Sequence, residues 1–226
     1  MDITDLEGWN VKDLVIIGAG GVGRETAMVV EQINQAGAEW NLLGFIDDDV
    51  RLHGALVNRY KVLGGMDRID SFKEAYVVCA IANCAVRKSI ICAVRQKVKG
   101  FANIIHPSVY LSPDNSIGEG NIIYPGVVLS TNVTIGNHVI ISPKCGIGHD
   151  AVIRDYCSLL WNVNVSGHVD IGEGVTMGSG STVIQNRTIG EGTIVGAGAT
   201  VIHDLPPYCT AVGVPARVIK NNIKPA

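Results

Sequence analysis

The chain has 226 residues, of which 47% are hydrophobic and 17% are charged, and its formal net charge is −3 at pH 7. This length and composition predict a globular protein with room for two modest domains. The slight acidity and the lack of a basic cluster argue against a nucleic-acid partner, no apolar run is long enough to span a membrane, and the acidic first residues do not resemble a signal peptide.

The first hundred residues alternate between strand and helix patterns. This alternation predicts a small βαβαβ half of a doubly wound α/β fold, a Rossmann-like domain that we expect over residues 1–104. The predicted elements are strands over 14–17, 42–46 and 75–81, a helix over 24–36, and a second helix that follows Asn83 and ends near Lys97.

A glycine-rich turn, Gly18-Ala19-Gly20-Gly21-Val22-Gly23, follows the first strand. Such a turn lets a diphosphate approach the backbone and the amides of the next helix. Asp47 ends the second strand, where a ribose hydroxyl would lie. The motif is typical of nicotinamide dehydrogenases, but only one mononucleotide half precedes a different architecture, so we favour another nucleotide bound by its diphosphate. A turn that binds nothing remains an alternative.

From Ile105 onward, every sixth residue is aliphatic or Met. A period of six fits neither a helix nor a flat strand, but it fits a chain that turns a corner of about 120° every six residues and closes a triangular coil every 18. A β-sandwich has no reason to keep one phase for so long. We expect this series to point inward: Ile105, Leu111, Ile117, Ile123, Leu129, Ile135, Ile141, Ile147, Ile153, Leu159, Val165, Ile171, Met177, Val183, Ile189, Val195 and Val201.

Smaller residues support the same coil. Small or β-branched residues four places after an aliphatic, such as Val127 and Cys145, are also predicted to point inward. Glycine often follows the aliphatic residue, and we expect these glycines to supply corner conformations that a Cβ forbids. Stacked coils of this kind make a prism about 25 Å tall.

A glycine-turn domain joined to such a prism resembles the bacterial sugar acetyltransferases of glycan assembly. These include nucleotide-diphospho-4-amino-sugar N-acetyltransferases and sialic acid O-acetyltransferase relatives. The resemblance implies a left-handed parallel β-helix with a C-terminal cap over 105–226, a homotrimer, acetyl-CoA as co-substrate between neighbouring prisms, and a nucleotide-linked amino sugar beside the first domain. It rests on the glycine turn and on Phe45-Ile46-Asp47-Asp48, Ala80-Ile81-Ala82-Asn83, Ile105-His106-Pro107-Ser108, Gly148-His149-Asp150, Val195-Gly196-Ala197-Gly198-Ala199 and Val212-Gly213-Val214-Pro215-Ala216.

The resemblance also implies roles for single residues. His149 is then the general base, and Asp150 raises its basicity. Ser158 stands where several relatives have a second histidine that contacts the acyl group, and Gly20-Gly21-Val22 replaces their Ser-Gly-His. The implied nucleotide-sugar contacts are Gly20, Gly21, Val22, Asp47, Asp48 and Ala82, and the implied acetyl-CoA contacts are Ser158, Ser179, Ala197 and Gly167, whose amide would face the thioester oxygen.

The choice of His149 also follows from chemistry. Acyl transfer from a thioester needs a base whose pKa lies near neutral pH, which favours histidine. His149 directly precedes the carboxylate of Asp150 on an outward-facing wall in the middle of the prism. We expect His168 to be a structural or acyl-site neighbour, His138 a wall residue and His106 a residue of the domain junction. His53 and His203 are predicted to lie in loops.

Two other functions are considered and disfavoured. A zinc-dependent lyase on a similar prism needs three convergent histidines, which the histidine spacing does not provide, so no metal is expected. A non-catalytic scaffold has no need of the His149-Asp150 pair. No cysteine pair has C-x-x-C spacing, which indicates a reducing cytoplasm. The cysteines are Cys79, Cys84, Cys92, Cys145, Cys157 and Cys209.

The sequence therefore predicts a cytoplasmic, acetyl-CoA-dependent N-acetyltransferase that acts on the amino group of a nucleotide-activated amino sugar in bacterial surface glycan biosynthesis. The alternative is O-acetylation of a sugar hydroxyl, as on a sialic acid. The identity of the sugar, the nucleotide base and the acyl chain length stay open.

Overall fold

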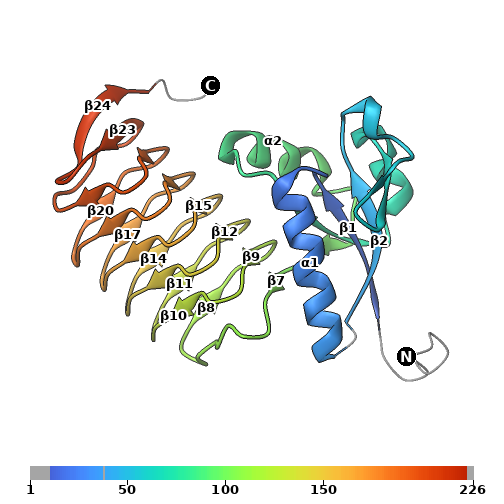
Figure 1. Ribbon diagram of the computed structural model, residues 1–226, viewed down its shortest axis with the longest axis horizontal. Coiled ribbons are helices and arrows are strands. Elements are labelled where there is room, and N and C mark those ends of the chain that lie inside the picture. The colour runs from blue at the N-terminus through green and yellow to red at the C-terminus, as the bar shows by residue number, and fades with distance from the viewer. Residues whose placement is uncertain (1–10, 38, 223–226) are drawn as a thin grey trace.

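A computed structural model describes residues 11–37 and 39–222 of the chain, in an α/β unit and a β-prism that lie side by side (Figure 1). The acidic first residues, on which the prediction about a signal peptide rests, lie outside the described residues. Within the described residues, no helix is both long and apolar enough to cross a bilayer.

The α/β unit has one six-stranded sheet in the order β3-β4-β2-β1-β5-β6, parallel except for β3. The core of this sheet is the predicted βαβαβ arrangement. Its elements are β1 (Lys12–Ile17), α1 (Gly21–Ala36), β2 (Trp40–Ile46), a 3-10 helix (Val50–Leu52), β3 (Leu56–Val57), β4 (Tyr60–Gly64), a 3-10 helix (Met66–Phe72), β5 (Tyr76–Cys79), α2 (Cys84–Val94) and β6 (Gly100–Phe101).

Both faces of this sheet are covered, which explains why β1 reads as one apolar run. Leu14 and Ile16 pack with α1 on one face, whereas Val15 and Ile17 pack with α2 on the other. The first helix begins at Gly21, three residues earlier than predicted, so the last part of the glycine motif is helical. A Cβ at Gly23 would lie 1.9 Å from the carbonyl oxygen of Gly18, so the close approach of α1 to β1 requires glycine there.

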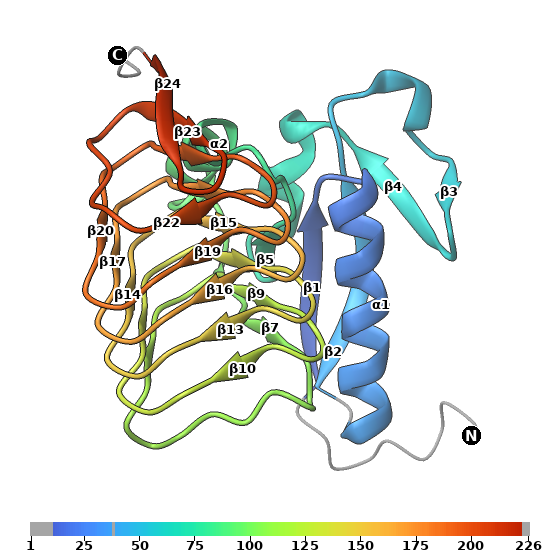
Figure 2. The same ribbon diagram turned by 60° about the vertical axis from the view of Figure 1, so that its left-hand side comes forward.

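The second unit is a left-handed β-helix whose coils stack into a triangular prism (Figure 2). Its three parallel sheets have the orders β10-β13-β16-β19-β22, β20-β17-β14-β11-β8 and β24-β23-β21-β18-β15-β12-β9-β7, and only β24 is antiparallel to its neighbour. We call them the first, second and third sheet.

Each strand of the prism is two residues long, except for the last two strands, β23 and β24, which are longer. They are β7 (Ile104–Ile105), β8 (Ser116–Ile117), β9 (Ile122–Ile123), β10 (Val128–Leu129), β11 (Thr134–Ile135), β12 (Ile140–Ile141), β13 (Gly146–Ile147), β14 (Val152–Ile153), β15 (Ser158–Leu159), β16 (Asn164–Val165), β17 (Asp170–Ile171), β18 (Thr176–Met177), β19 (Thr182–Val183), β20 (Thr188–Ile189), β21 (Ile194–Val195), β22 (Thr200–Val201), β23 (Cys209–Val212) and β24 (Arg217–Asn221).

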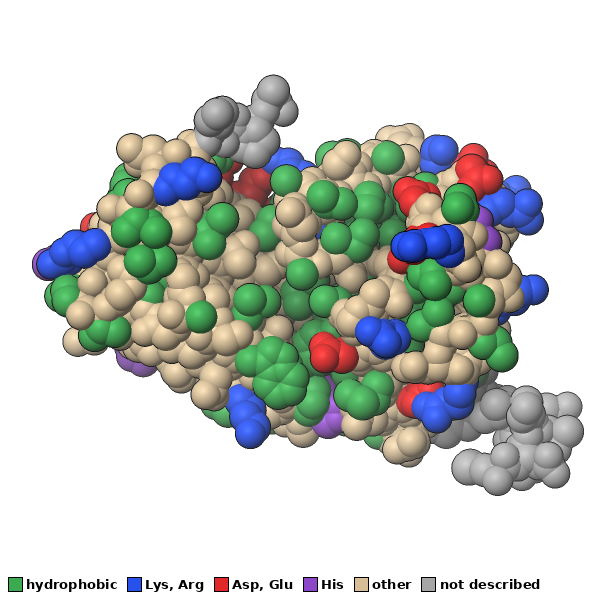
Figure 3. Space-filling model, turned by 45° about the horizontal axis from the view of Figure 1, so that its top comes forward, with side chains coloured by type: hydrophobic (Ala, Val, Ile, Leu, Met, Phe, Trp, Pro, Cys, Tyr) green, Lys and Arg blue, Asp and Glu red, His purple; other side chains and the backbone are tan. Residues whose placement is uncertain are grey.

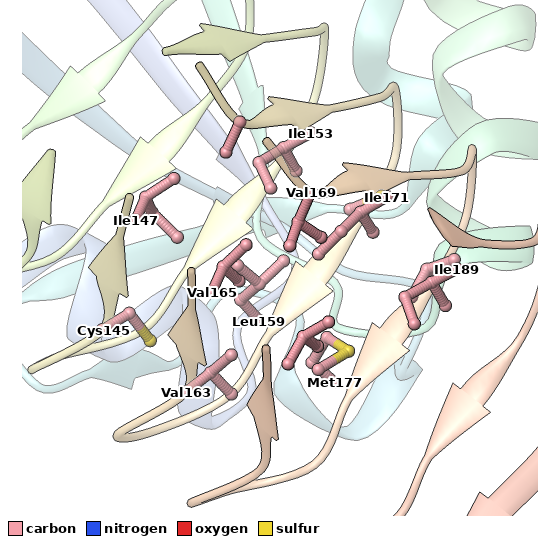
Figure 4. Close-up of a cluster of buried hydrophobic side chains, with 14 of the residues drawn as sticks. Cys145, Ile147, Ile153, Leu159, Val163, Val165, Val169, Ile171, Met177 and Ile189 are labelled. Carbon is pink, nitrogen blue, oxygen red and sulfur yellow. The ribbon is translucent and has the colours of Figure 1, made fainter. Parts of the chain in front are cut away.

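The predicted inward series forms the core of the prism from Ile123 to Val201 (Figure 4). The smaller series, which includes Val127 and Cys145, is buried with it, as predicted. The prediction is wrong at Leu111, which is 41% exposed. No strand forms between Ile105 and Ser116, and the first coil is therefore irregular.

Left-handed residues recur at every sixth position from 120 to 198 and turn the chain at the prism edges. The asparagines among them suit this conformation. We name the edges by position: the His149 edge has Asn132, Asp150, His168 and Asn186; the Ser179 edge has Gly126, Lys144, Asn162, Gly180 and Gly198; and the junction edge has Gly120, His138, Tyr156, Gly174 and Gly192.

The glycines that follow the aliphatic residues have a different role from the one predicted. They do not have the left-handed conformation. A Cβ at Gly148 would instead lie 2.6 Å from the amide nitrogen of Gly167, and one at Gly178 would lie 2.5 Å from that of Ala197. These glycines therefore let successive coils approach closely, which is why the expectation of a special corner conformation was wrong.

Arg87 on α2 joins the two units at the junction edge. Its side chain is fully buried and donates hydrogen bonds to carbonyl oxygens of His138, Tyr156 and Cys157 on the prism. It also donates to the carbonyl oxygens of Ile81 and Ala82 in its own unit. A buried charge is tolerated only when it has such hydrogen-bond partners. These bonds therefore fix how the two units pack against each other.

A second contact between the two units lies at α1, where the hydroxyl of Tyr124 donates to the carbonyl of Val22 at 3.1 Å.

His138 was predicted to be a wall residue. That prediction is wrong, because its side chain is fully buried at the junction. The domain boundary between residues 104 and 105 stays a prediction; β7, at that point, pairs with β9 of the prism.

Candidate active site

His149 and Asp150 lie together on the His149 edge. Nδ1 of His149 is 2.7 Å from Oδ2 of Asp150. Asn132, one coil before, donates its amide Nδ2 to the other carboxylate oxygen of Asp150 at 3.1 Å. The coil above holds the backbone, because the amide of His168 donates to the carbonyl of His149 at 2.9 Å. The pair is thus fixed by three stacked coils.

The electrostatics of this edge keep the Asp150 carboxyl ionised beside His149. The hydrogen bond from His149, and then that from Asn132, lower the pKa of the Asp150 carboxyl, which stays ionised. An ionised carboxylate beside Nδ1 selects the tautomer with the proton on that atom, which leaves the lone pair on Nε2. The side chain of His149 is 55% exposed, so Nε2 can reach a substrate.

Gly167 lies directly beside the free side of the His149 ring. A Cβ at this position would lie 2.6 Å from Nε2 of His149. The sequence predicted a role for the Gly167 amide, whereas the geometry adds a role for its missing side chain. Glycine at this position leaves the space beside Nε2 open.

His168 completes this group of side chains. Its Nε2 is 3.6 Å from Oδ2 of Asp150, and its ring meets that of His149 edge-on, with centroids 5.0 Å apart. Among the residues described, the ligand-type atoms of His149, Asp150 and His168 lie within 4.8 Å of one another and could hold a metal ion. The sequence argument against zinc considered only three histidines and overlooked a carboxylate as the third donor.

The predicted nucleotide contacts lie at the end of β1 and around the glycine turn. Around Gly20 and Gly21, a Cβ would meet no atom within 4 Å, so the space above the turn is open. The carboxylate of Asp47 accepts hydrogen bonds from the amides of Ala19 and Asp49 at 2.8 and 2.9 Å, and that of Asp48 accepts one from Met66 at 2.8 Å. Both aspartates therefore shape the loops of this site.

Ser158 lies away from His149, at the junction with the α/β unit. Its side chain is buried, and its hydroxyl donates to the carbonyl of Ala82 at 2.8 Å and receives a hydrogen bond from Arg87 at 3.0 Å. Ser158 belongs to the third sheet, whereas the His149 edge lies between the first and second sheets. Within one chain, Ser158 thus braces the predicted nucleotide contact Ala82 and does not face the predicted base.

Ser179 and Ala197 are neighbours on the Ser179 edge. The amide of Gly198, next to Ala197, donates to the carbonyl of Ser179 at 2.9 Å, and both residues are exposed. This edge borders the first sheet on the side opposite to the His149 edge. The structure therefore brings His149, Asp150 and Gly167 together, but it leaves Ser179 and Ala197 on a separate edge and Ser158 at the junction.

Two residues of the site were missed by sequence reasoning. Asn132 could have been found, because it precedes Asp150 by 18 residues, which is one full coil. Arg87 shares a helical stripe with Ile91 and Val94, where an arginine looks misplaced. That anomaly was the available indication, but its partners depend on how the two units pack.

The chain matches two family models. One describes the PglD N-terminal domain and matches residues 13–94, and the other describes the bacterial transferase hexapeptide (six repeats) and matches residues 116–149. A relative over most of the chain is the GDP-perosamine N-acetyltransferase of Escherichia coli O157:H7, which is 34% identical over 173 residues, 75% of this chain and 77% of the relative. Serine acetyltransferase 3 of Arabidopsis thaliana is 39% identical over 87 residues, and the chain spans only 22% of its length.

Solved structures resemble the whole fold. PerB of Caulobacter crescentus, in complex with CoA and GDP-perosamine, is 30% identical, with a TM-score of 0.83 over 93% of this chain and 98% of that one. The acetyltransferase domain of PglB from Neisseria gonorrhoeae, in complex with acetyl coenzyme A, is 27% identical, with a TM-score of 0.81 over 92% of this chain and 100% of that one.

Proposed function

The chain belongs to the family of two-domain, hexapeptide-repeat sugar N-acetyltransferases, and from this premise we propose that it transfers the acetyl group of acetyl-CoA to the amino group of a nucleotide-activated amino sugar in bacterial surface glycan biosynthesis. The observation that carries the proposal is the ordered pair His149-Asp150 on an exposed prism edge. The relatives with a stated sugar substrate act on an amine, so N-acetylation is favoured over O-acetylation of a hydroxyl.

His149 acts as the general base in this proposal. As the neutral sugar amine attacks the thioester carbonyl, Nε2 takes the proton from the amine nitrogen. The Asp150 carboxylate, 2.7 Å from Nδ1, stabilises the imidazolium that forms. The amide of Gly167 supplies a hydrogen bond to the oxyanion, and the CoA thiolate leaves as the tetrahedral intermediate collapses to the amide.

The nucleotide end of the substrate binds at the glycine turn. The open space above Gly20 and Gly21 leaves room for a diphosphate, and the first amides of α1, including that of Val22, point toward this space with the positive end of the helix dipole. Asp47, Asp48 and Ala82 border the nucleoside. Their own hydrogen bonds hold the loops in place, which supports a preformed pocket.

A homotrimer is part of the proposal, because one chain leaves the predicted contacts on two edges. Acetyl-CoA would lie between the His149 edge of one subunit and Ser179 and Ala197 on the facing edge of its neighbour. The junction contact of Tyr124 with Val22 keeps the glycine turn near the prism. Because the α/β unit is joined to its own prism at the junction edge and not at the His149 edge, we propose that the nucleotide domain of one subunit serves the base of the next. We also propose a cytoplasmic location, for which the unpaired cysteines are the support.

The test is an acetyl-transfer assay that follows CoA release with purified protein. The substrate panel comprises amino sugars linked to GDP, UDP and dTDP, together with CMP-sialic acid and free sialic acid. Acetylation of one nucleotide-linked amine, with His149→Ala lowering turnover about 10²- to 10⁴-fold and His203→Ala as the matched control, supports the proposal. Turnover only on sialic acid, or an unaffected His149→Ala variant, would remove it.

A further inference from the structure

We propose that the His149 edge is also a binding site for a first-row divalent transition-metal ion such as Zn²⁺, ligated by His149, Asp150 and His168, and that the bound ion inhibits acetyl transfer. The binding site stands on the geometry alone. The inhibition rests on the proposed function, because it requires His149 to be the base.

The donor atoms suit a tetrahedral ion. Ligand atoms at about 2.0–2.2 Å from zinc lie about 3.3 Å from one another. Oδ2 of Asp150 and Nε2 of His168 are 3.6 Å apart, and Nδ1 of His149 is 2.7 Å from the same oxygen. The three ligand atoms lie within 4.8 Å of one another, so a small opening of the His149-Asp150 contact and an approach of the two imidazoles bring them to bonding distance. Two imidazoles and one carboxylate favour Zn²⁺, Co²⁺ or Ni²⁺ over Mg²⁺ or Ca²⁺.

The coil stacking holds the donors in place before any ion arrives. Asp150 and His168 occupy equivalent left-handed corners in successive coils, with φ of 59° and 55°. The backbone hydrogen bond from His168 to His149 fixes their spacing at 2.9 Å between N and O. Binding therefore requires side-chain adjustment without refolding of the backbone, so little ordering cost opposes it.

A supporting residue orients the carboxylate toward the ion. Asn132 donates to Oδ1 of Asp150 at 3.1 Å, which leaves Oδ2 directed at both histidines. Hydrogen bonds of this kind to a ligating group raise metal affinity in known sites. The side chains of His149 and His168 are 55% and 56% exposed. Three protein ligands leave the fourth position of the ion to water.

The ion would inhibit by taking the place of a proton. The ion binds Nδ1 of His149 in place of the ring proton, which moves to Nε2, and this breaks the hydrogen bond to Asp150. The carboxylate then supports the ion in place of the imidazolium. Because Nε2 then carries the ring proton, it has no lone pair with which to accept the proton of the amine.

The binding test uses untagged protein freed of metal with a chelator. Co²⁺ is titrated and its visible absorption is followed, and Zn²⁺ is titrated by calorimetry. We expect one equivalent to bind to the wild type and to His203→Ala, which lacks an exposed histidine elsewhere. His168→Ala is expected to bind at least about tenfold more weakly. Equal affinity of His168→Ala and the wild type would overturn the site.

The inhibition test compares each variant with its own metal-free activity. Zn²⁺ is expected to inhibit the wild type and His203→Ala at the concentrations at which it binds, whereas His168→Ala resists. Full activity of the zinc-loaded wild type would refute the inhibition. If no amino sugar on the panel is acetylated, the proposed function fails, but the Co²⁺ titration still decides whether the metal site exists.

Discussion

His138 is predicted to make the stability of the protein fall as the pH drops below about 6.5. Its side chain is fully buried between the rings of Phe101 and Tyr156, and its Nδ1 has no hydrogen-bond partner. The pKa of His138 falls from the ordinary 6.5 to about 4, chiefly because of burial and also because of Arg95 and Arg87, whereas the carboxylates of Glu119 and Asp155 act in the opposite direction.

The sign and size of the effect follow from proton linkage. Between the two pKa values the unfolded chain binds a proton at His138 and the folded chain does not, so acid favours unfolding. The stabilisation is complete above the unfolded pKa and is lost as the pH falls through 6.5 toward the folded value of about 4. At about 1.4 kcal/mol for each unit of pKa difference, the loss amounts to about 3 kcal/mol.

His138→Asn is a suitable perturbation, because asparagine adopts the same left-handed conformation at the corners occupied by Asn132, Asn162 and Asn186. The variant cannot titrate in this range, and it loses the ring packing. Urea unfolding of both proteins, followed by circular dichroism from about pH 7.5 to about pH 4, measures the difference in free energy of unfolding. The wild type should be more stable at neutral pH, and its advantage should shrink by about 3 kcal/mol in acid. A difference that stays constant with pH would refute the reasoning.

Three glycines lead to further predictions. Gly167→Ala places a methyl group 2.6 Å from Nε2 of His149, and we expect at least about 10²-fold lower turnover with an unchanged melting temperature; unaffected turnover would mean that the amine approaches from another side. Gly23→Ala brings a Cβ within 1.9 Å of the carbonyl oxygen of Gly18 and should cost about 3 kcal/mol in urea unfolding; wild-type stability would show that α1 can shift at no cost. A Cβ at Gly21 would meet no atom within 4 Å, so Gly21→Leu should keep the melting temperature and weaken nucleotide-sugar binding in calorimetry, while acetyl-CoA binding stays the same; unchanged sugar affinity would favour a turn that binds nothing.

The fold was predictable from the sequence where one physical requirement repeats. The inward position recurs every six residues from Ile123 to Val201, so each coil confirms the phase set by the others. Leu111 is the exception, because the irregular first coil has no strand to orient it. Strands β3 and β4 were missed, since short strands at a sheet edge leave little periodicity to detect.

The site was predictable where it is local in sequence. His149 and Asp150 are adjacent in the chain, and their hydrogen bond follows from that adjacency. The burial of His138 and the place of Ser158 at the junction were not predictable, because their surroundings come from α2 and the loop before it, which pack against the prism from far away in the sequence. No pattern within the hexapeptide repeats indicates which outward residues another domain will cover.

Hydrophobic side chains gather where the two units meet, and single Lys, Arg, Asp and Glu side chains are scattered around them (Figure 3). Beneath this surface, Arg87 holds the two units in one fixed relative position. Its guanidinium has carbonyl acceptors on both sides, so any rotation of one unit would leave a buried cation without its acceptors. Domain closure around the substrate is therefore disfavoured. The spacing between the glycine turn and the prism is set once, when the chain folds, and a sugar that does not match this spacing cannot be accommodated by a hinge.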